Sequence, residues 1–392
     1  MKKKKILLIG PIGDFGGREL EVGFIANALN EECDVKICST VYYTKQSQVF
    51  DFVAEEHMFS LAGKVVEKHM IIKLFAFIAY IRFGFKYSVS CFFNNKINKK
   101  YASVVRKTHQ VIEDLIVEND MIIICAQLSS AYMKEIVSYS FDKNIPVVFR
   151  TTGAVIKENF STNEKIEWLE KVSLYLHHSV NNTNRLVFLN NYNTKIIDQC
   201  AFNEKRLFEI PLLEEKVNIF LTISRLVKEK NIDIVIKAFK KIKKDGDKLY
   251  VVGNGSDLKN LIAIADGDED IVFTGFVDNI KLVKYFKIAQ CVIISYYEFE
   301  TGPLTGIEAM SAARIIISSK TGAMEERIPF NKFWYDNSVE LLVEQMNSVK
   351  KLTKNECFTY SSEIREEYLK GYSIASIKKK YRNVVNETLS SL

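Results

Sequence analysis

The feature that most constrains this chain is a stretch in its C-terminal third in which an apolar run leads, through a loop, into a run of helix formers. Residues 290–295 are apolar and β-branched, as in a buried strand of a parallel sheet, and residues 307–313 favour a helix. Glu300 and Glu308 therefore bracket a strand-to-helix loop. In open α/β sheets ligands bind at such loops, because the amides there present unpaired donors to an anion.

Glu308 falls in the first turn of the predicted helix, where the helix dipole favours a carboxylate that can accept hydrogen bonds from sugar hydroxyls. The alternative for this residue is a surface glutamate that only compensates the dipole. The whole stretch, with Ala309-Met310 after the second glutamate, resembles the nucleotide-sugar site of the family 4 retaining glycosyltransferases of the GT-B fold. The resemblance implies an α/β protein with two Rossmann-like parallel-sheet domains facing a central cleft.

A second segment, residues 217–239, has the pattern of a strand, a basic loop and an amphipathic helix. Arg225 and Lys230 follow the strand together. An arginine fork and a lysine point charge suit two linked phosphates, and the resemblance implies that they hold the donor diphosphate as catalytic residues with Glu300. A solvated face on a lysine-rich chain is the alternative.

Two further strands are predicted to end in glycine turns, at residues 248–255 and 270–278. Both resemble the nucleotide-facing loops of the family. Because glycine permits close approach of the backbone to a base or ribose, Gly253, Gly255 and Val277 are predicted to bind the donor. A single glycine is more often only a turn, but the alternation of strands and helices predicts a nucleotide-binding domain.

The resemblance also assigns roles within the first loop. It implies that Glu300 bonds the sugar hydroxyls and Glu308 the ribose. Pro303 stands where the family usually has glycine, and proline removes a backbone donor. We therefore expect the amides of Leu304 and Thr305 to carry the anion contact.

The N-terminal half opens with a predicted strand, residues 5–10, and a glycine loop. Gly10, Gly13 and Gly16 are not spaced as a dinucleotide fingerprint, so no nicotinamide cofactor is expected. The resemblance places Gly16 and Gly17 on the acceptor side; a plain strand-to-helix connection is the alternative.

Three more strands are predicted in this half, at residues 119–126, 146–153 and 184–190. Many family members carry a histidine after the second of them, whereas this chain has Arg150 and Thr152, which become acceptor-side candidates. The pair His177-His178 is interpreted as structural or surface residues of a helix, since it has no carboxylate or cysteine at metal spacing.

Metal chemistry finds little support in the sequence. The acidic triplets at residues 245–247 and 266–268 do not directly end apolar strands, and we interpret them as solvated turns. No metal or other cofactor is expected beyond the donor, a UDP- or GDP-sugar. The seven scattered cysteines form no disulfide framework, which favours a reducing cytoplasm.

The chain length suits two domains. We expect an acceptor-side domain at residues 1–212, a nucleotide-sugar domain at residues 213–365, and a helix at residues 366–392 that, by resemblance, returns to the first domain.

A net charge of +6 suits an anionic partner. Residues 68–106 combine aromatic and apolar side chains with lysines, which is typical either of a helix lying in a membrane interface or of a buried helix; both stay open. No nucleic-acid motif accompanies the basic residues.

These observations predict a metal-independent, retaining hexosyltransferase that acts on a hydroxyl of a glycan acceptor. We expect a lipid-linked bacterial acceptor of the capsule or lipopolysaccharide kind, and a cytoplasmic protein that is peripheral on the inner face of the membrane. Two alternatives remain: a nucleotide-sugar epimerase of the same fold, and a noncatalytic assembly partner in polysaccharide synthesis.

Overall fold

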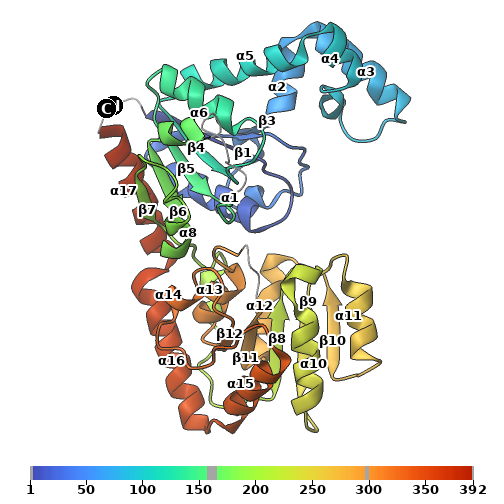
Figure 1. Cartoon of the computed structure of the whole chain (residues 1–392), viewed down its shortest axis with the longest axis vertical. Helices are drawn as coiled ribbons and strands as arrows, with labels where there is room; N and C mark the ends of the chain where they lie inside the picture. Colours follow the sequence, from blue (N-terminus) through green and yellow to red (C-terminus); the bar gives the residue numbers. More distant parts are fainter. Residues whose placement is uncertain (1–2, 157–165, 296–299, 391–392) are drawn as a thin grey trace. The chain divides into compact units, whose positions relative to one another are not determined.

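The structure is a computed structural model that describes residues 3–156, 166–295 and 300–390. The chain divides into two compact units. Unit 1 comprises residues 1–177, 182–197 and 378–392, and unit 2 comprises residues 178–181 and 198–377. Each unit is a parallel sheet flanked by helices, which confirms the predicted α/β class (Figure 1).

Unit 1 contains a seven-stranded sheet in the order β3-β2-β1-β4-β5-β6-β7, with every neighbouring pair parallel. Its central strands are almost continuously buried, as expected where helices cover both faces of a sheet. The predicted strands at 5–10, 119–126 and 146–153 are confirmed as β1, β4 and β5. The strands are β1 (Lys4–Gly10), β2 (Cys33–Ser39), β3 (Met58–Ser60), β4 (Met121–Ala126), β5 (Val147–Thr151), β6 (Leu174–His177) and β7 (Thr194–Ile196).

The helices around this sheet include a group that extends beyond its edge. In Figure 1, α3 and α4 lie away from the strands, joined to the sheet layer through α2 and α5. Most of the last helix, α17, belongs to unit 1, where Arg382 Nε donates to Ala28 O at 2.8 Å. The helices are α1 (Gly17–Leu29), α2 (Leu61–Lys68), α3 (Met70–Arg82), α4 (Lys96–Tyr101), α5 (Val104–Val117), α6 (Met133–Asp142), α8 (Val180–Asn184) and α17 (Ile374–Ser390).

Two expectations for this half were wrong. In place of the predicted strand at 184–190, Asn184 ends α8 and residues 185–188 form a turn. Leu186 and Leu189 are buried while Val187 is exposed, so the apolar spacing is that of helical turns and not of a strand. His177 is also not helical, because it ends the buried strand β6.

Unit 2 contains a five-stranded parallel sheet in the order β10-β9-β8-β11-β12. The predicted strands in residues 217–223, 248–252, 270–275 and 290–295 are confirmed as β8 to β11. The strands are β8 (Ile219–Ile223), β9 (Lys248–Val252), β10 (Ile271–Gly275), β11 (Cys291–Ile294) and β12 (Ile315–Ser318).

Two groups of helices pack around this sheet. α10 contacts α11 and α15, while α13 contacts α9 and α16. A single apolar core joins these helices to the strands. The helices are α9 (Glu204–Phe208), α10 (Ile232–Ile242), α11 (Leu258–Ala265), α12 (Asn279–Ile288), α13 (Leu304–Ser311), α14 (Met324–Arg327), α15 (Val339–Lys351) and α16 (Lys354–Gly371).

The strand order of unit 2 determines where the predicted site residues meet. β8 and β11 are hydrogen-bonded neighbours, with Cys291 paired to Phe220 and Val292 to Leu221. Because both strands run in the same direction, the segments after Ile223 and Ile294 leave the sheet at one edge. The two loops singled out in the sequence therefore lie side by side.

Candidate functional site

The centre of the candidate site is an ion pair between the loops that follow β8 and β11. Lys230 Nζ donates to Glu300 Oε2 at 2.7 Å, although the two residues are 70 positions apart. Their side chains keep 15% and 19% of their surface exposed, so the pair is screened from bulk water but open to a ligand. The structure thus brings together two of the three predicted catalytic residues.

Glu300 is fixed by more than its lysine. Its Oε1 accepts hydrogen bonds from the amides of Thr301 at 3.1 Å and Gly302 at 3.3 Å. Burial by itself would raise the pKa of Glu300, but the charge and hydrogen bond of Lys230 and these two amides outweigh it, so the pKa lies below its ordinary value. Glu300 is therefore a fixed carboxylate at neutral pH, able to accept hydrogen bonds.

Helix α13 begins directly after this loop, with Pro303 at its N-cap. Thr305 Oγ1 donates to the carbonyl of Ile223 at 3.3 Å, which ties the start of α13 to the end of β8. The hydroxyl of Thr305 is thus committed to the fold. The first amides of a helix lack intrahelical acceptors, so the amides of Leu304 and Thr305 remain the expected anion donors.

Glu308 lies one turn further along α13 and is 3% exposed. Within the part of the chain that the structure describes, no hydrogen-bonding or charged partner of its carboxyl group is found. Burial accordingly raises the pKa of Glu308 to about 8. A buried carboxyl group without a partner is costly, and a ligand that donates hydrogen bonds to it would relieve that cost. A dipole-compensating surface glutamate, the alternative from sequence, does not fit this burial.

Arg225 is exposed in the loop after β8. Its neighbours connect this loop to the glycine turn after β9: Ser224 N donates to Val252 O at 3.1 Å and Leu226 N to Asn254 O at 3.0 Å. Arg225 thus projects from a fixed backbone at the same sheet edge as Lys230.

Glycine is required in that turn by close packing of the backbone, which the sequence argument did not consider. A Cβ atom at Gly253, where φ is +138°, would lie 1.9 Å from Ser224 O, and one at Gly255 would lie 2.2 Å from Leu226 O. Both positions therefore exclude any other residue, whether or not a nucleotide binds. Val277, the other base-pocket candidate, packs partly buried against the core of unit 2.

Sequence reasoning missed the residues that anchor the Glu300 loop from behind. Arg327 is fully buried and donates to Asp198 through Nε at 2.7 Å and Nη2 at 2.6 Å. Its Nη1 donates to Pro303 O at 2.6 Å. His178 shares a hydrogen bond with Thr301 Oγ1 at 3.4 Å. These residues are far apart in the sequence and anchor the loop only because the fold buries them together. A single sequence contains no motif that would predict this role.

In unit 1 the glycine loop after β1 lies beside the end of β5. Arg18 Nε donates to Thr152 Oγ1 at 3.1 Å, and its Nη1 donates to Pro11 O at 2.9 Å. Gly16 and Gly17 are exposed, and Gly16 has φ of +143°. The structure therefore groups three of the four predicted acceptor-side residues, Gly16, Gly17 and Thr152.

The fourth, Arg150, needs a correction. Its guanidinium is fully buried in β5, where Nε and Nη2 donate to Glu21 Oε1 at 2.8 and 2.6 Å and Nη1 donates to Ile197 O at 2.6 Å. Tyr381 of α17 also donates to Glu21. Arg150 is part of the core of unit 1 and cannot reach an acceptor.

The acidic triplets are turns, as the sequence suggested, but only their first two residues are solvated: Asp245 and Asp266 are exposed, whereas the last aspartate of each triplet is held by partners. Asp247 is 3% exposed, pairs with Lys350 and accepts from Lys244 N at 2.7 Å. Asp268 accepts from Lys243 Nζ at 2.6 Å. Among the residues that the structure describes, no three His, Cys, Asp or Glu side chains are arranged to hold a metal ion.

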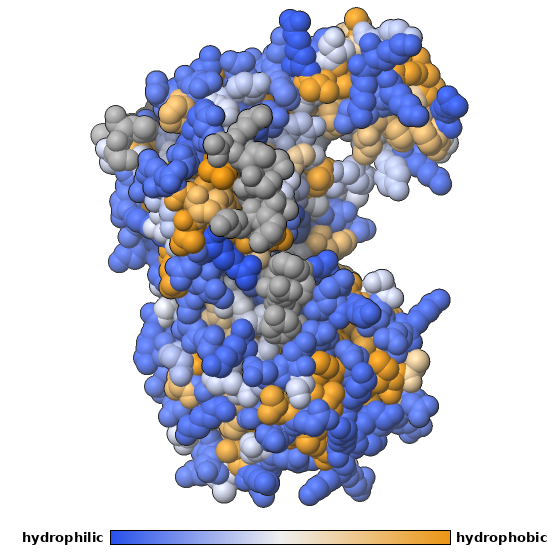
Figure 2. All heavy atoms as spheres, in the orientation of Figure 1, coloured by the Kyte–Doolittle hydropathy of each residue, from blue (hydrophilic) through white to orange (hydrophobic). Residues whose placement is uncertain are grey.

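For residues 68–106 the alternative of a buried helix does not fit the exposure of α3. We define the arm as residues 69–101; of α3 within it, only Ile72, Ala76 and Ala79 are buried. Apolar spheres gather over this part of the molecule in Figure 2. The exposed large apolar side chains of the arm are Met70, Ile71, Leu74, Phe77, Ile78, Ile81, Phe83, Phe85, Tyr87, Ile97 and Tyr101.

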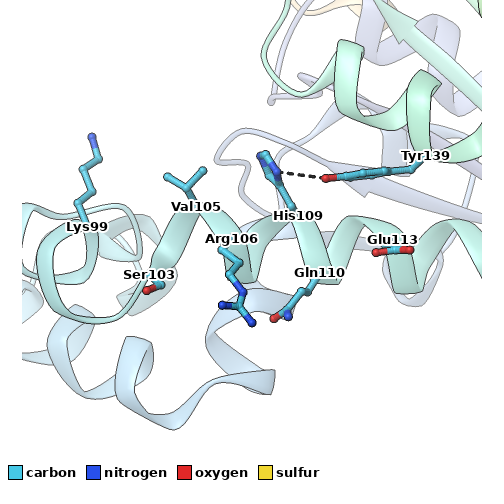
Figure 3. Close-up of a pocket in the computed structure, with 8 residues that line it drawn as sticks. All are labelled: Lys99, Ser103, Val105, Arg106, His109, Gln110, Glu113 and Tyr139. Atoms are coloured by element: carbon cyan, nitrogen blue, oxygen red, sulfur yellow. Dashed lines mark hydrogen bonds between the residues drawn. The ribbon is translucent and has the colours of Figure 1, made fainter.

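A hollow at the base of the arm lies between α4, α5 and α6 (Figure 3). His109 Nδ1 and Tyr139 OH, 3.3 Å apart, meet at its rim, and Lys99 and Arg106 add two cations. It contains none of the residues predicted to bind donor or acceptor.

Similarity to known proteins is found both in sequence and in fold. Residues 203–364 match the family model described as "Glycosyl transferases group 1". The alpha-monoglucosyldiacylglycerol synthase of Streptococcus pneumoniae is 31% identical over 111 residues, which is 27% of this chain and 25% of that protein. An uncharacterized glycosyltransferase of Methanocaldococcus jannaschii is 31% identical over 119 residues, 29% of this chain and 30% of its own. The chain thus spans less than a third of the curated relatives it matches.

The likeness to solved structures extends over the whole chain. Anabaena HepE, solved in complex with UDP, has a TM-score of 0.68 at 17% identity, covering 99% of this chain and 100% of its own. The sucrose-phosphate synthase of Thermosynechococcus elongatus has a TM-score of 0.70 at 14% identity, covering 100% of both chains. At these identities the likeness is one of fold.

Proposed function

We propose that the protein moves a sugar from a nucleotide diphosphate sugar to a hydroxyl of a lipid-linked glycan acceptor, with retention and without a metal. The proposal starts from the match of residues 203–364 to the group 1 glycosyltransferase model and from the GT-B fold of the chain. The observation that carries this proposal is the Lys230–Glu300 pair at the carboxyl edge of the unit 2 sheet. It joins a cation suited to a diphosphate and a carboxylate suited to sugar hydroxyls.

The donor would be bound by the loops after β8 and β11. Arg225 and Lys230 would contact the diphosphate, the amides of Leu304 and Thr305 would add donors, Glu300 would bond the sugar hydroxyls and Glu308 the ribose. Negative charge grows on the departing diphosphate, so the two cations stabilise the transition state more than the ground state. A donor with uracil is favoured by the complexes of HepE with UDP and with UDP-glucose.

Retention would follow from attack on the same face as the leaving group. The acceptor oxygen forms a bond to the anomeric carbon as the bond from that carbon to the diphosphate oxygen breaks, and the acceptor proton passes to the departing diphosphate. Glu300 is better suited to positioning than to nucleophilic attack, since Lys230 and two loop amides bind its oxygens.

The arm supports an acceptor carried by a lipid. From Lys68 to Ile112 the chain has nine Lys and Arg and no Asp or Glu, which leaves 45 basic against 48 acidic residues elsewhere. Exposed apolar side chains beside cations fit the interface of an anionic membrane, where each cation contributes about 1 kcal/mol. No helix among the described residues has the length and apolarity to cross a bilayer. We propose peripheral binding to the inner face of the membrane. The pneumococcal relative is named for the glycolipid that it makes, which supports an acceptor carried by a lipid.

A melting-temperature screen tests the donor half of the proposal. UDP, GDP, ADP and CMP are added, with and without magnesium, to the wild type, Arg225→Ala and the exposed neighbour Lys228→Ala. We expect one diphosphate to stabilise the wild type and Lys228→Ala, by about 2.7 kcal/mol at a hundred times its Kd, independently of magnesium, and to have no effect on Arg225→Ala.

The outcomes separate the alternatives. No shift with any nucleotide would favour a noncatalytic assembly partner, which Pro303 and the missing histidine suggest. A shift together with a new sugar product from donor alone, without acceptor, would favour an epimerase. Magnesium-dependent binding would refute the metal-free mechanism.

A further inference from the structure

A cavity of about 420 Å³ opens in unit 1 where the arm meets the carboxyl edge of the sheet. One wall is the segment after β2, residues 40–45, and the floor includes Ser60 and Ala62 at the start of α2. The other wall belongs to the arm, at Ser88 and around the short helix η3 (Val89–Phe92). This is the sheet edge at which α/β folds bind ligands.

The lining is rich in hydroxyl groups and poor in charge. Seven hydroxyl-bearing residues face the cavity: Thr40, Tyr42, Tyr43, Thr44, Ser60, Ser88 and Ser90. No Asp or Glu occurs among its lining residues, all of which the structure describes. The one cation, Lys45, is already paired with Glu55 at 3.2 Å.

This chemistry selects the ligand class. An anion would meet a single cation, Lys45, whose side chain is 86% exposed to solvent and shared with Glu55. A hydrocarbon tail would remove hydroxyls from water without replacing their hydrogen bonds. An uncharged ligand with many hydroxyls can both donate to and accept from Tyr42, Ser88 and Ser90. The half-exposed ring of Tyr42, packed edge-on against Tyr87 at 5.7 Å, offers an apolar face to the C–H side of a sugar ring.

The wall formed by residues 40–45 is fixed to the glycine loop of the acceptor side. Asp14 accepts from Thr44 N at 2.6 Å and from Thr44 Oγ1 at 3.0 Å. Ser47 Oγ donates to Gly13 O at 2.7 Å, and Gly16 N donates to Gln48 Oε1 at 2.9 Å. The cavity wall is therefore fixed to the loop that carries Gly16 and Gly17, although the two glycines do not line the cavity.

The opposite wall is continuous with the apolar surface of the arm. Asn98, fully buried, donates to Ile72 O at 3.1 Å and Phe93 O at 2.8 Å, and Asn95 donates to Phe75 O at 3.1 Å. These hydrogen bonds attach to α3 the segment of the arm that lines the cavity. A lipid could thus place its headgroup in the cavity and its chains along exposed residues such as Leu74 and Phe77.

We propose that this cavity binds the uncharged sugar headgroup of the glycolipid acceptor while the arm contacts its chains. The proposal rests on the proposed function for the identity of the ligand, but the cavity can be tested without any nucleotide.

The probe is octyl β-glucoside below its critical micelle concentration, observed by saturation-transfer NMR on the wild type, Tyr42→Ala, Ala62→Phe and Phe141→Ala. Tyr42→Ala removes the ring, Ala62→Phe fills the cavity, and Phe141→Ala removes an exposed aromatic from α6, away from the cavity. We expect saturation of the sugar-ring protons with the wild type and Phe141→Ala, and a Kd raised about tenfold in both cavity variants.

Saturation of the octyl protons alone, or ring saturation that both cavity variants leave unchanged, would overturn the proposal. Failure of the proposed donor site would give a different result from failure of the cavity proposal. In that case UDP fails to stabilise the wild type while the ring signals still depend on Tyr42. Conversely, sugar transfer to octyl glucoside with the same KM in wild type and Tyr42→Ala would show that the cavity does not bind the acceptor. The proposed function would then still stand.

Discussion

Two ion pairs in this protein have similar geometry, but one is buried and the other is partly exposed. In unit 1, Arg150 and Glu21 meet at 2.6 Å with 0% and 4% of their side chains exposed. In unit 2, Lys230 and Glu300 meet at 2.7 Å with 15% and 19% exposed. The first pair is enclosed by β5, α1 and α17, whereas the second lies at the carboxyl edge of a sheet.

The contrast shows that the residue types of a charged pair do not reveal its role. A sealed pair can only hold the fold together, because no ligand can replace either partner. A pair at a sheet edge can exchange its partner for a ligand: a diphosphate for Lys230, sugar hydroxyls for Glu300. Burial, which depends on the whole fold, separates the two.

The largest effect is expected for Arg150→Met, which leaves Glu21 buried without its cation. Breaking a buried pair in this way typically costs about 3–5 kcal/mol, so the urea midpoint should fall strongly. Adding Glu21→Gln should recover part of the loss, because the uncompensated charge is then gone. A loss under about 1 kcal/mol for Arg150→Met would mean that the pair is not sealed and that Arg150 must be reconsidered as an acceptor residue.

Lys230→Met should have the reverse profile. We expect its free energy of unfolding to fall less than that of Arg150→Met, since the loop amides still bind Glu300 and both side chains of the pair are partly exposed. The rate of sugar transfer should fall about 100- to 1000-fold, because a charge on the departing diphosphate is no longer met. The matched control is Lys228→Met in the same loop. Normal turnover of Lys230→Met, or a large loss of its stability, would contradict the view that one pair is structural and the other binds a ligand.

The sequence was sufficient for the parts of the molecule that local pattern encodes. The alternation of buried strands and helices predicted the α/β class, and the two glutamates after an apolar run predicted a loop that the structure brings to Lys230. Neighbouring parallel strands necessarily present their exit loops together. The sequence also drew attention to the glycines at positions 253 and 255, as residues that let a nucleotide approach. The structure adds that packing against the loop after β8 already requires glycine at both positions.

What the sequence could not supply depends on tertiary environment. Arg150 and Arg225 both follow or end apolar strands, yet one is sealed and the other exposed. Asp198 and Arg327 are 129 residues apart, and only the fold shows that together they support Pro303. The exposure of the arm is likewise invisible in composition, because an apolar helix is usual in a core.

The smallest effect, a pH dependence, concerns Glu308, a third carboxyl group, which has no cation as partner among the residues that the structure describes. Burial raises its pKa to about 8. The folded protein then binds this proton more tightly than the unfolded chain, so the contribution of Glu308 to stability is greatest below its ordinary pKa of 4.5 and declines as the pH rises towards 8. A ribose that donates to the carboxylate favours the ionised form and lowers this pKa, which couples nucleotide binding to proton release.

The affinity for the diphosphate should therefore rise with pH, by roughly tenfold between pH 7 and 9, and level off once Glu308 is ionised in the free protein. Isothermal titration in buffers of different ionisation enthalpy should show the release of up to about one proton near pH 7. Glu308→Gln cannot ionise, so its affinity, although weaker, should stay level over this range. An equal slope in wild type and Glu308→Gln would show that the nucleotide does not contact Glu308, and would place the ribose elsewhere on the edge that Lys230 and Glu300 share.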